Sequence, residues 1–479
     1  MSNFLYANDQ RATYPSSWYA QSVDHGPKRA GLDQPLTCDV CVIGAGFTGL
    51  STALHLAQKG FRVVVLEAHR VGFGASGRNG GQMGSGLNQD QCKLEKTLGQ
   101  DAAHRLWEMT QEAKFLTRSL IAQHAPEAGY QPGVAEADFT QSDSDASHAK
   151  ADYLARNYGY TDIECLDKSA ISALIISPSY AGGILDWGAG YLHPLRYAMG
   201  LAQAAETAGA TLYEDSAVLQ VQDGTPNIVD TEHGQVKAGY VVHATNGYHN
   251  SLNRKQAKRV LPINNYLVAT APLADPQSVL TKNIAVADNR FVLNYYRLSH
   301  DNRLIFGGGE SYGAKFPKDI FAKVRRPLTQ IFPQLADVDL TPAWGGTLVI
   351  TTTRLPILAR VGHHQLTASG YSGHGIALAG LAGLVLAEAI AGDAARTHAA
   401  DTDGQPMATA ATPNEGCGRP HLATYSPDTA HRPSPSPDAP AQPMPTARPP
   451  HSTLRLSPIH ISEPPRPLTI PHVVLPLKK

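Results

Sequence analysis

The chain has 479 residues, 42% of them hydrophobic, with 40 basic and 41 acidic side chains and a formal net charge of −1 at pH 7. This length is sufficient for two packed domains. The balance of charge excludes the basic surface with which proteins bind nucleic acid, and it gives no reason to expect attraction to an acidic membrane.

The start of the chain carries no recognisable targeting signal. The first 35 residues are polar, aromatic and contain proline, and they lack the charged and apolar regions of a signal peptide. We find no apolar run of the roughly 18 to 20 residues that a membrane span needs, and residues 376–390 read as a buried helix. We therefore expect a cytoplasmic protein without a membrane span.

A dinucleotide-binding motif begins near residue 38. Residues 39–43 predict a buried strand and residues 47–59 predict a helix. The turn between them has the G-x-G-x-x-G spacing, which permits a tight turn, close approach of a pyrophosphate and close packing of helix on strand; its glycines are Gly44, Gly46 and Gly49. Glu67 follows a second predicted strand, where a carboxylate can bind ribose hydroxyls. The motif predicts NAD or FAD and disfavours NADP.

A glycine-dense loop follows Glu67 directly. Its residues are Gly72, Gly74, Ala75, Ser76, Gly77, Arg78, Asn79, Gly80 and Gly81. Such a loop can lay its backbone N–H groups along a pyrophosphate and a flavin ring. The loop therefore favours FAD over NAD, since the glycines would cost entropy without a ligand to hold.

The chain from residue 93 to residue 395 alternates predicted helices and strands. Apolar residues at helical spacing over 93–123 predict one long helix or two, and they open a second domain. The other predicted helices are 146–158, one that Asp167 caps, one after the turn at Gly190, 320–331 and 376–390. The predicted extended segments include 126–139, 240–244, 262–272, 290–298, 303–308 and 365–369. Residues 370–375 (GYSGHG) form a glycine-rich turn before the last helix, where an anion can bind.

Four segments resemble the D-amino-acid-oxidase superfamily of FAD-dependent amine oxidoreductases, and within it the gamma-glutamylputrescine oxidases. They are 63–82 (VVVLEAHRVGFGASGRNGGQ), 190–202 (GYLHPLRYAMGLA), 295–309 (YYRLSHDNRLIFGGG) and 370–378 (GYSGHGIAL). The resemblance implies an α/β fold with a Rossmann-type FAD-binding domain and a discontinuous antiparallel-sheet substrate domain. It assigns 36–92, 166–250 and 346–395 to the FAD-binding domain, and 93–165 and 251–345 to the substrate domain.

The resemblance also implies which residues bind FAD, and that they bind it noncovalently. They are Gly44, Gly46, Gly49, Glu67, Ser76, Gly77, Arg78, Asn79, Gly80, Gly81, Val218 at the adenine, and Gly373, His374 and Gly375 at the isoalloxazine ring. No metal is expected. Cys38 and Cys41 have C-x-x-C spacing but lie in a predicted strand, where an offset of three places side chains on opposite faces.

The implied reaction is hydride transfer from the carbon beside a neutral amine, followed by hydrolysis to an aldehyde and ammonia and by reoxidation with oxygen to hydrogen peroxide. Four residues are candidates for catalysis: His193, Tyr295, Arg297 and His374. Tyr295 and Arg297 share one face of a predicted strand, where the arginine could hold a substrate carboxylate. Each candidate also has a structural interpretation, such as a helix-start packing role for His193. Trp344 and Arg354 are weaker candidates.

Other functions remain open: a sarcosine, glycine or D-amino-acid oxidase, a dehydrogenase that passes electrons to a quinone, or a non-catalytic flavoprotein. The composition changes at residue 396, after which the chain is rich in proline, alanine, threonine and histidine. Residues 396–479 are expected to be a disordered tail, a polyproline-type ligand or, as we favour, an artefact of a shifted reading frame. We expect no stable fold and no catalytic residue there.

Overall fold

The computed structural model describes residues 4–248, 252 and 257–403, and the side chains up to residue 392. Contacts between Cα atoms divide the chain into Met1–Ala395 and Arg396–Lys479. All strands of the described chain belong to the first unit, and of the second unit only residues 396–403, in helix α10, are described. The predictions made for the tail therefore fall almost wholly outside the described residues.

The first sheet has eight strands and is mainly parallel. Its main path is β16-β17-β10-β1-β2-β7, and β9 and β8 add to it antiparallel from β10. The strands are β1 (Leu36–Ile43), β2 (Val63–Leu66), β7 (Thr211–Tyr213), β8 (Val218–Gln222), β9 (Asn227–Thr231), β10 (Gln235–His243), β16 (Ile357–Gly362) and β17 (Gln365–Ser369). The predicted strands of the dinucleotide motif, β1 and β2, lie side by side and parallel at its centre. All four residues of β2 are buried, as expected where helices and loops cover a parallel sheet.

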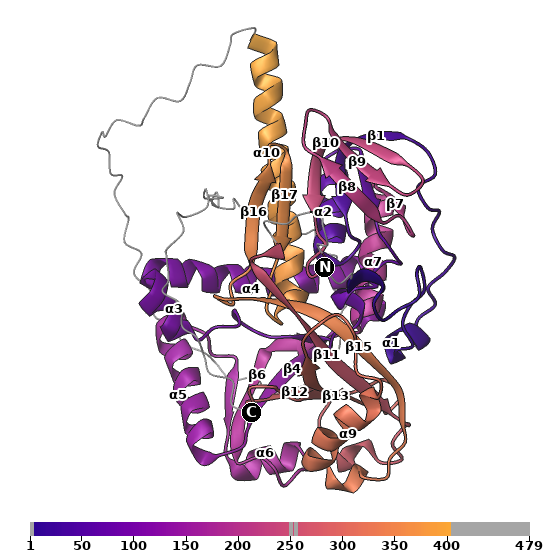
Figure 1. The fold of residues 1–479 in the computed structure, drawn as a ribbon. Helices are drawn as coiled ribbons and strands as arrows, with labels where there is room; N and C mark the ends of the chain where they lie inside the picture. Colours follow the sequence, from indigo (N-terminus) through magenta and orange to yellow (C-terminus); the bar gives the residue numbers. More distant parts are fainter. Residues whose placement is uncertain (1–3, 249–251, 253–256, 404–479) are drawn as a thin grey trace, which may run out of the picture. The chain divides into compact units, whose positions relative to one another are not determined.

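Two helices that begin at glycine-rich turns pack closely on each other. They are α2 (Phe47–Ala57) and α10 (Gly375–Asp403). Ser51 Oγ on α2 donates to the carbonyl of Gly380 at 2.7 Å, and Thr52 Oγ1 donates to that of Gly383 at 3.2 Å. A Cβ at Gly383 would lie 2.6 Å from the Ser51 Cβ, so only glycine permits this approach. Figure 1 shows α10 rising beside α2 and the first sheet.

The segment Gly375–Gly392 of α10 has 18 residues and a mean hydropathy of 1.9, so our expectation that no run reaches spanning length is wrong by length and composition. Of this segment, however, 67% is buried inside the protein. It behaves as a core helix, which agrees with the predicted burial of residues 376–390.

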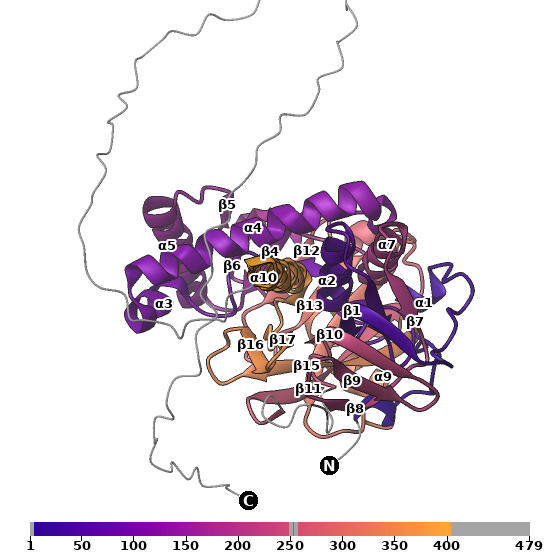
Figure 2. The same cartoon turned by 90° about the horizontal axis from the view of Figure 1, so that it is seen from above.

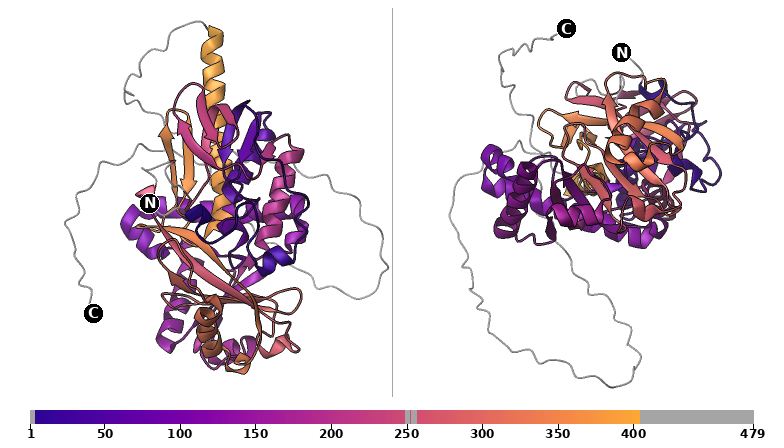
Figure 3. Two further views of the ribbon diagram at one scale, coloured as in Figure 1. Left: turned by 45° about the vertical axis from the view of Figure 1, so that its right-hand side comes forward. Right: turned by 90° about the horizontal axis from the view of Figure 1, so that it is seen from below.

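The second sheet has nine strands and is mainly antiparallel. Its main path is β15-β11-β14-β13-β12-β4-β6-β3, with β5 paired to β6. The strands are β3 (Gln82–Met83), β4 (Gln131–Asp138), β5 (Ile163–Leu166), β6 (Gly182–Tyr191), β11 (Val260–Thr270), β12 (Ala285–Asp288), β13 (Tyr295–Leu298), β14 (Leu304–Ser311) and β15 (Leu340–Thr351). One face packs on α9 (Ile320–Ile331) in a large apolar core that includes Tyr266, Tyr296 and Phe306. The left view of Figure 3 shows this layer below the first sheet.

Most of the remaining helices follow the predictions, but the helix predicted over 146–158 begins at residue 141, and the short helix over residues 18–21 was not predicted. The helical region predicted over 93–123 is two helices, α3 (Gln91–Leu98) and α4 (Gln100–His124), because Gly99 takes φ +85° between them. Asp167 caps α6 (Lys168–Leu174), accepting a hydrogen bond from the Ala170 N–H as predicted. The others are α1 (Trp18–Gln21), α5 (Gln141–Tyr158) and α7 (Pro194–Thr207). Figure 2, with α10 seen end-on, shows α4 passing beside it and α3 and α5 at one end of α4.

Some boundaries differ from the predictions. Residues 166–250 were expected with the first sheet, but β6 pairs with β4 and β5, so the chain joins the first sheet only at β7. Gly190, expected in a turn, lies within β6 instead, which ends at Tyr191. Residues 290–294 are not strand, because the Asp288 carboxylate accepts from the N–H of Asn294 and bends the chain there. Pairing over long sequence distances decides the boundaries at β6, and local pattern does not report it.

The segment before β1 forms hydrogen bonds and ion pairs with loops that connect strands of both sheets. Asn8 Nδ2 donates to the carbonyl of Ala314 at 2.7 Å, and Arg11 pairs with Asp215 at 2.5 Å and with Glu232 at 2.6 Å. Asp9 pairs with Arg78 of the glycine-dense loop at 3.0 Å. This N-terminal segment therefore helps to hold that loop in place.

Candidate active site

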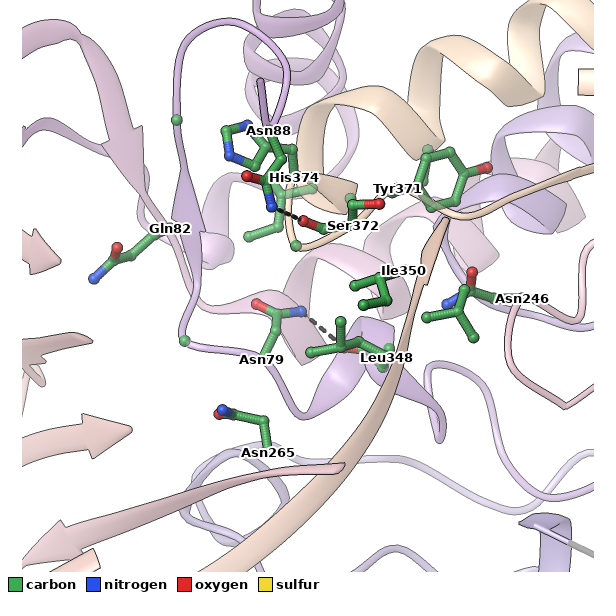
Figure 4. A pocket seen from close by; sticks show the side chains of 18 of the residues that line it. Asn79, Gln82, Asn88, Asn246, Asn265, Leu348, Ile350, Tyr371, Ser372 and His374 are labelled. Carbon is green, nitrogen blue, oxygen red and sulfur yellow. Dashed lines mark hydrogen bonds between the residues drawn. The ribbon is translucent and has the colours of Figure 1, made fainter. Parts of the chain in front are cut away.

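A cavity of about 1020 Å³ is lined by residues of both sheets and of the loops between them. This volume is at the upper end of the range for ligand sites in proteins. One part of its wall is the dinucleotide motif, and another is the open face of the second sheet. Figure 4 shows several polar side chains around it, among them Asn79, Gln82, Asn246 and Asn265.

The three motif glycines each make a close approach to neighbouring atoms. Gly44 has φ +107°, and a Cβ there would lie 2.8 Å from the Ala244 carbonyl oxygen. A Cβ at Gly49 would lie 1.9 Å from the Gly44 oxygen, so Gly49 serves packing and does not line the cavity. Gly46 lines the cavity at the start of α2, and a Cβ there would lie 2.9 Å from Ser76 Oγ. The start of α2 thus gives an anion close access to backbone N–H groups.

Glu67 is held rigidly at the edge of this motif. Its Oε2 accepts from the Ala45 N–H at 2.8 Å and its Oε1 accepts from the His69 N–H at 2.9 Å. Burial raises the pKa of this carboxyl to about 7, although the backbone N–H groups oppose the shift. Val218, expected at the adenine, also lines the cavity. A fixed carboxylate here can accept hydrogen bonds from ribose hydroxyls.

Arg78 and Asn79 brace the glycine-dense loop from within. The Arg78 Nε donates to the Phe73 carbonyl at 2.7 Å and its Nη1 to the Gly345 carbonyl at 3.2 Å, and the side chain is 2% exposed. Its Nη2 is buried with no hydrogen-bond partner among the described residues. Asn79 Nδ2 donates to the carbonyl of Ala75 at 2.9 Å. Because buried polar groups normally have a hydrogen-bond partner, the unpaired Arg78 Nη2 fits a loop that binds an anionic cofactor.

Not every predicted residue of the loop faces the cavity. Ser76, Arg78, Asn79 and Gly80 line it, whereas Gly77 and Gly81 do not. A Cβ at Gly77 would lie 2.3 Å from the Gly72 oxygen, and one at Gly81 would lie 2.2 Å from the Leu192 oxygen. These two glycines are therefore needed for packing of the loop.

The turn before α10 forms another part of the wall. Gly373 takes φ +96°, and the Asn88 side chain donates to the Ser372 carbonyl at 2.5 Å, as Figure 4 shows. Gly373, His374 and Gly375, which are expected at the isoalloxazine ring, all line the cavity. Since α10 begins at Gly375, its positive dipole end is available to a ligand there.

His374 is buried, which lowers its pKa and keeps the ring neutral. Its Nδ1 lies 3.1 Å from the Gly86 carbonyl oxygen, which can only accept, so Nδ1 carries the proton. In this state Nε2 is an acceptor. The expectation that the side chain adds a hydrogen-bond donor at the flavin is therefore not met by this geometry.

Tyr295 lies on the cavity wall beside Asn265. Its hydroxyl donates to Asn265 Oδ1, and its ring fills the space over Gly80 and Gly307, where a Cβ would lie 2.6 and 2.1 Å from ring atoms. Both Tyr295 and Asn265 line the cavity. Sequence reasoning missed Asn265, although a polar residue within the apolar strand 262–272 was a usable signal.

Arg297 shares a face with Tyr295, as strand alternation predicts, but it does not line the large cavity. Its Nε donates to the Gly80 carbonyl at 3.1 Å and its Nη2 to the Tyr19 hydroxyl at 3.2 Å, and the side chain is 4% exposed. The guanidinium is thus used to hold the glycine-dense loop. The expected role in gripping a substrate carboxylate is not supported.

His193 is also outside the large cavity. It caps α7, where its Nδ1 accepts from the Arg196 N–H at 3.2 Å, and its Nε2 lies 3.0 Å from Ser22 Oγ. Burial and nearby arginines lower its pKa to about 2. The helix-start packing interpretation is therefore the one that the structure supports. Trp344 similarly donates to the Arg78 carbonyl, whereas Arg354 lines the cavity.

A scan against family models matches residues 39–389 to DAO, FAD dependent oxidoreductase. The chain is 40% identical over 389 residues to the gamma-glutamylputrescine oxidoreductase of Escherichia coli (strain K12), covering 81% of this chain and 91% of that protein. It is 38% identical over 404 residues to the probable oxidoreductase OrdL of Haemophilus influenzae, covering 82% and 91%. These matches extend over both sheets.

The fold is similar to that of glycine oxidase from Geobacillus kaustophilus, with a TM-score of 0.63 and 21% sequence identity over 74% of this chain and 95% of that one. Two helix starts, a fixed carboxylate and an unpaired buried guanidinium N–H around one cavity fit the cofactor of this family. The chain belongs to the DAO family of FAD-dependent oxidoreductases.

Proposed function

We propose that this enzyme oxidises the primary amine of gamma-glutamylputrescine with oxygen as the electron acceptor, giving an aldehyde, ammonia and hydrogen peroxide in the cytoplasm. The observation that carries the proposal is the 40% identity to a gamma-glutamylputrescine oxidoreductase over 91% of that protein. A cavity that joins the dinucleotide motif to a polar sheet face supports it, because such a cavity can hold cofactor and substrate together.

The chemistry that bound FAD supplies is acceptance of a hydride from the carbon beside the amine. The start of α10 would stabilise negative charge that develops at the cofactor, since its dipole end lines the cavity. Tyr295 and Asn265 would form the wall beside the reacting amine. Because burial disfavours charge, this wall also favours the neutral amine that the reaction requires.

The test is turnover by purified, FAD-loaded protein on a panel of amines, with hydrogen peroxide, ammonia and aldehyde measured separately. We expect gamma-glutamylputrescine to give the highest kcat/KM and putrescine a lower one, because putrescine lacks the polar glutamyl end. Faster turnover of sarcosine, glycine or a D-amino acid would replace the substrate assignment. Turnover with an artificial acceptor but without peroxide would make the enzyme a dehydrogenase, and no turnover would favour a non-catalytic flavoprotein.

A further inference from the structure

A buried lysine that belongs to none of the cofactor motifs contacts residues of the cavity wall. Lys114, in the middle of α4, is 2% exposed. Its Nζ donates to Ser85 Oγ at 2.7 Å and to the Tyr160 hydroxyl at 3.0 Å, and it lies 4.8 Å over the Tyr160 ring. No direct carboxylate partner of Lys114 is found among the described residues. The two hydroxyls therefore carry most of its hydrogen bonding.

The tyrosine connects this cation to an anion. The Tyr160 hydroxyl donates to Asp186 Oδ1 at 2.5 Å, and Ser85 Oγ lies 2.9 Å from the same hydroxyl. Asp186 is on β6, where its Oδ1 also accepts from the Gly188 N–H at 2.9 Å. Lys114, Ser85, Tyr160 and Asp186, which we call the Lys114–Asp186 cluster, thus place a positive and a negative group on either side of one phenol.

Three members of the cluster are open to ligand. Ser85, Tyr160 and Asp186 line the large cavity, and Lys114 lies directly behind them. Apolar side chains form much of the surrounding wall, among them Trp107, Leu154 and Ile184, and the ion pair of Lys150 with Glu136 lines the cavity near them. A few polar groups that converge within an apolar wall are typical of the part of a site that fixes a ligand's orientation.

The Lys114–Asp186 cluster contributes little to the stability of the fold for the charge that it buries. Burial lowers the pKa of Lys114 to about 8, which means that the interior disfavours its charge. Apolar side chains of similar volume would stabilise such a wall as well or better. A cation and an anion placed together at a cavity wall fit a ligand that carries both charges.

An α-amino-acid group carries both charges on one carbon. Its carboxylate can accept from the Ser85 hydroxyl once that hydroxyl turns from Tyr160 toward the cavity, and the charge of the buried Lys114 attracts it there. Its ammonium can donate to Asp186. A simple diamine has cations at both ends and could use only the aspartate. Arg297, the residue that sequence suggested for the carboxylate, is already bonded to the Gly80 carbonyl and the Tyr19 hydroxyl.

We propose that the Lys114–Asp186 cluster binds the α-amino-acid end of the substrate and so makes the enzyme prefer gamma-glutamyl amines to free diamines. The inference rests on the proposed function and adds the residues that recognise the part of the substrate remote from the oxidised carbon. Ser85 and Asp186 contact this end, and Lys114 and Tyr160 position them.

The binding test uses FAD-loaded protein and gamma-glutamylethylamide, which has the same amino-acid end but lacks the terminal primary amine that the proposed reaction oxidises. Calorimetric titration should show binding to the wild type that weakens about tenfold or more in Lys114→Met and in the isosteric Asp186→Asn. Lys28→Met is the matched control, because Lys28 also loses a polar partner, Asp215 at 2.7 Å, but is 42% exposed and does not line the cavity. It should bind the probe within about twofold of the wild type.

Kinetics give the second readout. In Asp186→Asn and Tyr160→Phe, KM for gamma-glutamylputrescine should rise while kcat changes little, and kcat/KM for putrescine should stay within about threefold of the wild type. Flavin content and melting temperature establish that each variant is folded. Equal losses on both substrates, unchanged binding in both charge variants, or no binding of the probe to the wild type would overturn the inference. Probe binding without oxidation of gamma-glutamylputrescine would refute only the proposed reaction.

Discussion

Two glycines of the dinucleotide motif, three residues apart, have different tasks. Gly46 faces the cavity, and a Cβ there would meet only the tip of the Ser76 side chain, at 2.9 Å. Gly49 faces the interior, and a Cβ there would meet the Gly44 backbone at 1.9 Å. A flexible hydroxyl can move aside, whereas a backbone oxygen between a strand and a helix cannot.

We therefore expect Gly46→Ala to fold and to lose FAD, because its methyl group occupies the approach of the pyrophosphate. Its apoprotein should melt within about 3 °C of the wild type while FAD binds at least about tenfold more weakly. Gly49→Ala should instead lose at least about 3 kcal/mol of unfolding free energy. Urea denaturation and flavin titration measure both quantities. Equal stability in the two variants would contradict the division of tasks.

At the scale of elements, the glycine-dense loop is supported from three directions: by Arg297 of β13, by Trp344 of β15 and by Asp9 of the N-terminal segment. Each contact reaches the loop backbone or Arg78. A loop of this composition has high conformational freedom when unfolded, so its order in the folded protein depends on such contacts.

Asp9 tests this dependence most directly. Asp9→Ala leaves the Arg78 guanidinium, which is 2% exposed, without its carboxylate, and it should cost about 3 kcal/mol of unfolding free energy and weaken FAD retention. Arg11→Ala is the control, because its ion pairs are among side chains 26% to 50% exposed. It should cost under about 1 kcal/mol. If the two variants lose equal stability, the N-terminal segment does not act through the loop.

The same elements show what the sequence could predict. The strand, turn and helix around Gly44–Gly49, the bounds of α9 and the cap at Asp167 all follow from local pattern. Local pattern does not predict the partners of β6. It also does not predict that Arg297 and His193 lie outside the large cavity. Strand alternation gives the face on which Arg297 lies, but only the tertiary pairing determines what that face meets.

At the scale of the whole molecule, both sheets and the described residues that line the cavity belong to the first unit. The described residues that line the cavity end at Ala379. Deletion of residues 404–479 should therefore leave the ratio of FAD to protein unchanged and shift the melting temperature by under about 2 °C. Absorbance of the purified protein and thermal melting check this. Loss of bound flavin on deletion would mean that residues beyond α10 support the site.

The strand order of the first sheet also determines when this enzyme can acquire its cofactor during synthesis. β1 emerges from the ribosome early, but its neighbour β10 follows about 200 residues later and β17 later still. Until then the unpaired edge of β1 must remain exposed in the nascent chain, which chaperones recognise. A cofactor that binds the completed sheet stabilises the folded state by mass action. We therefore expect the fraction of finished chains that stay folded to depend on the supply of FAD.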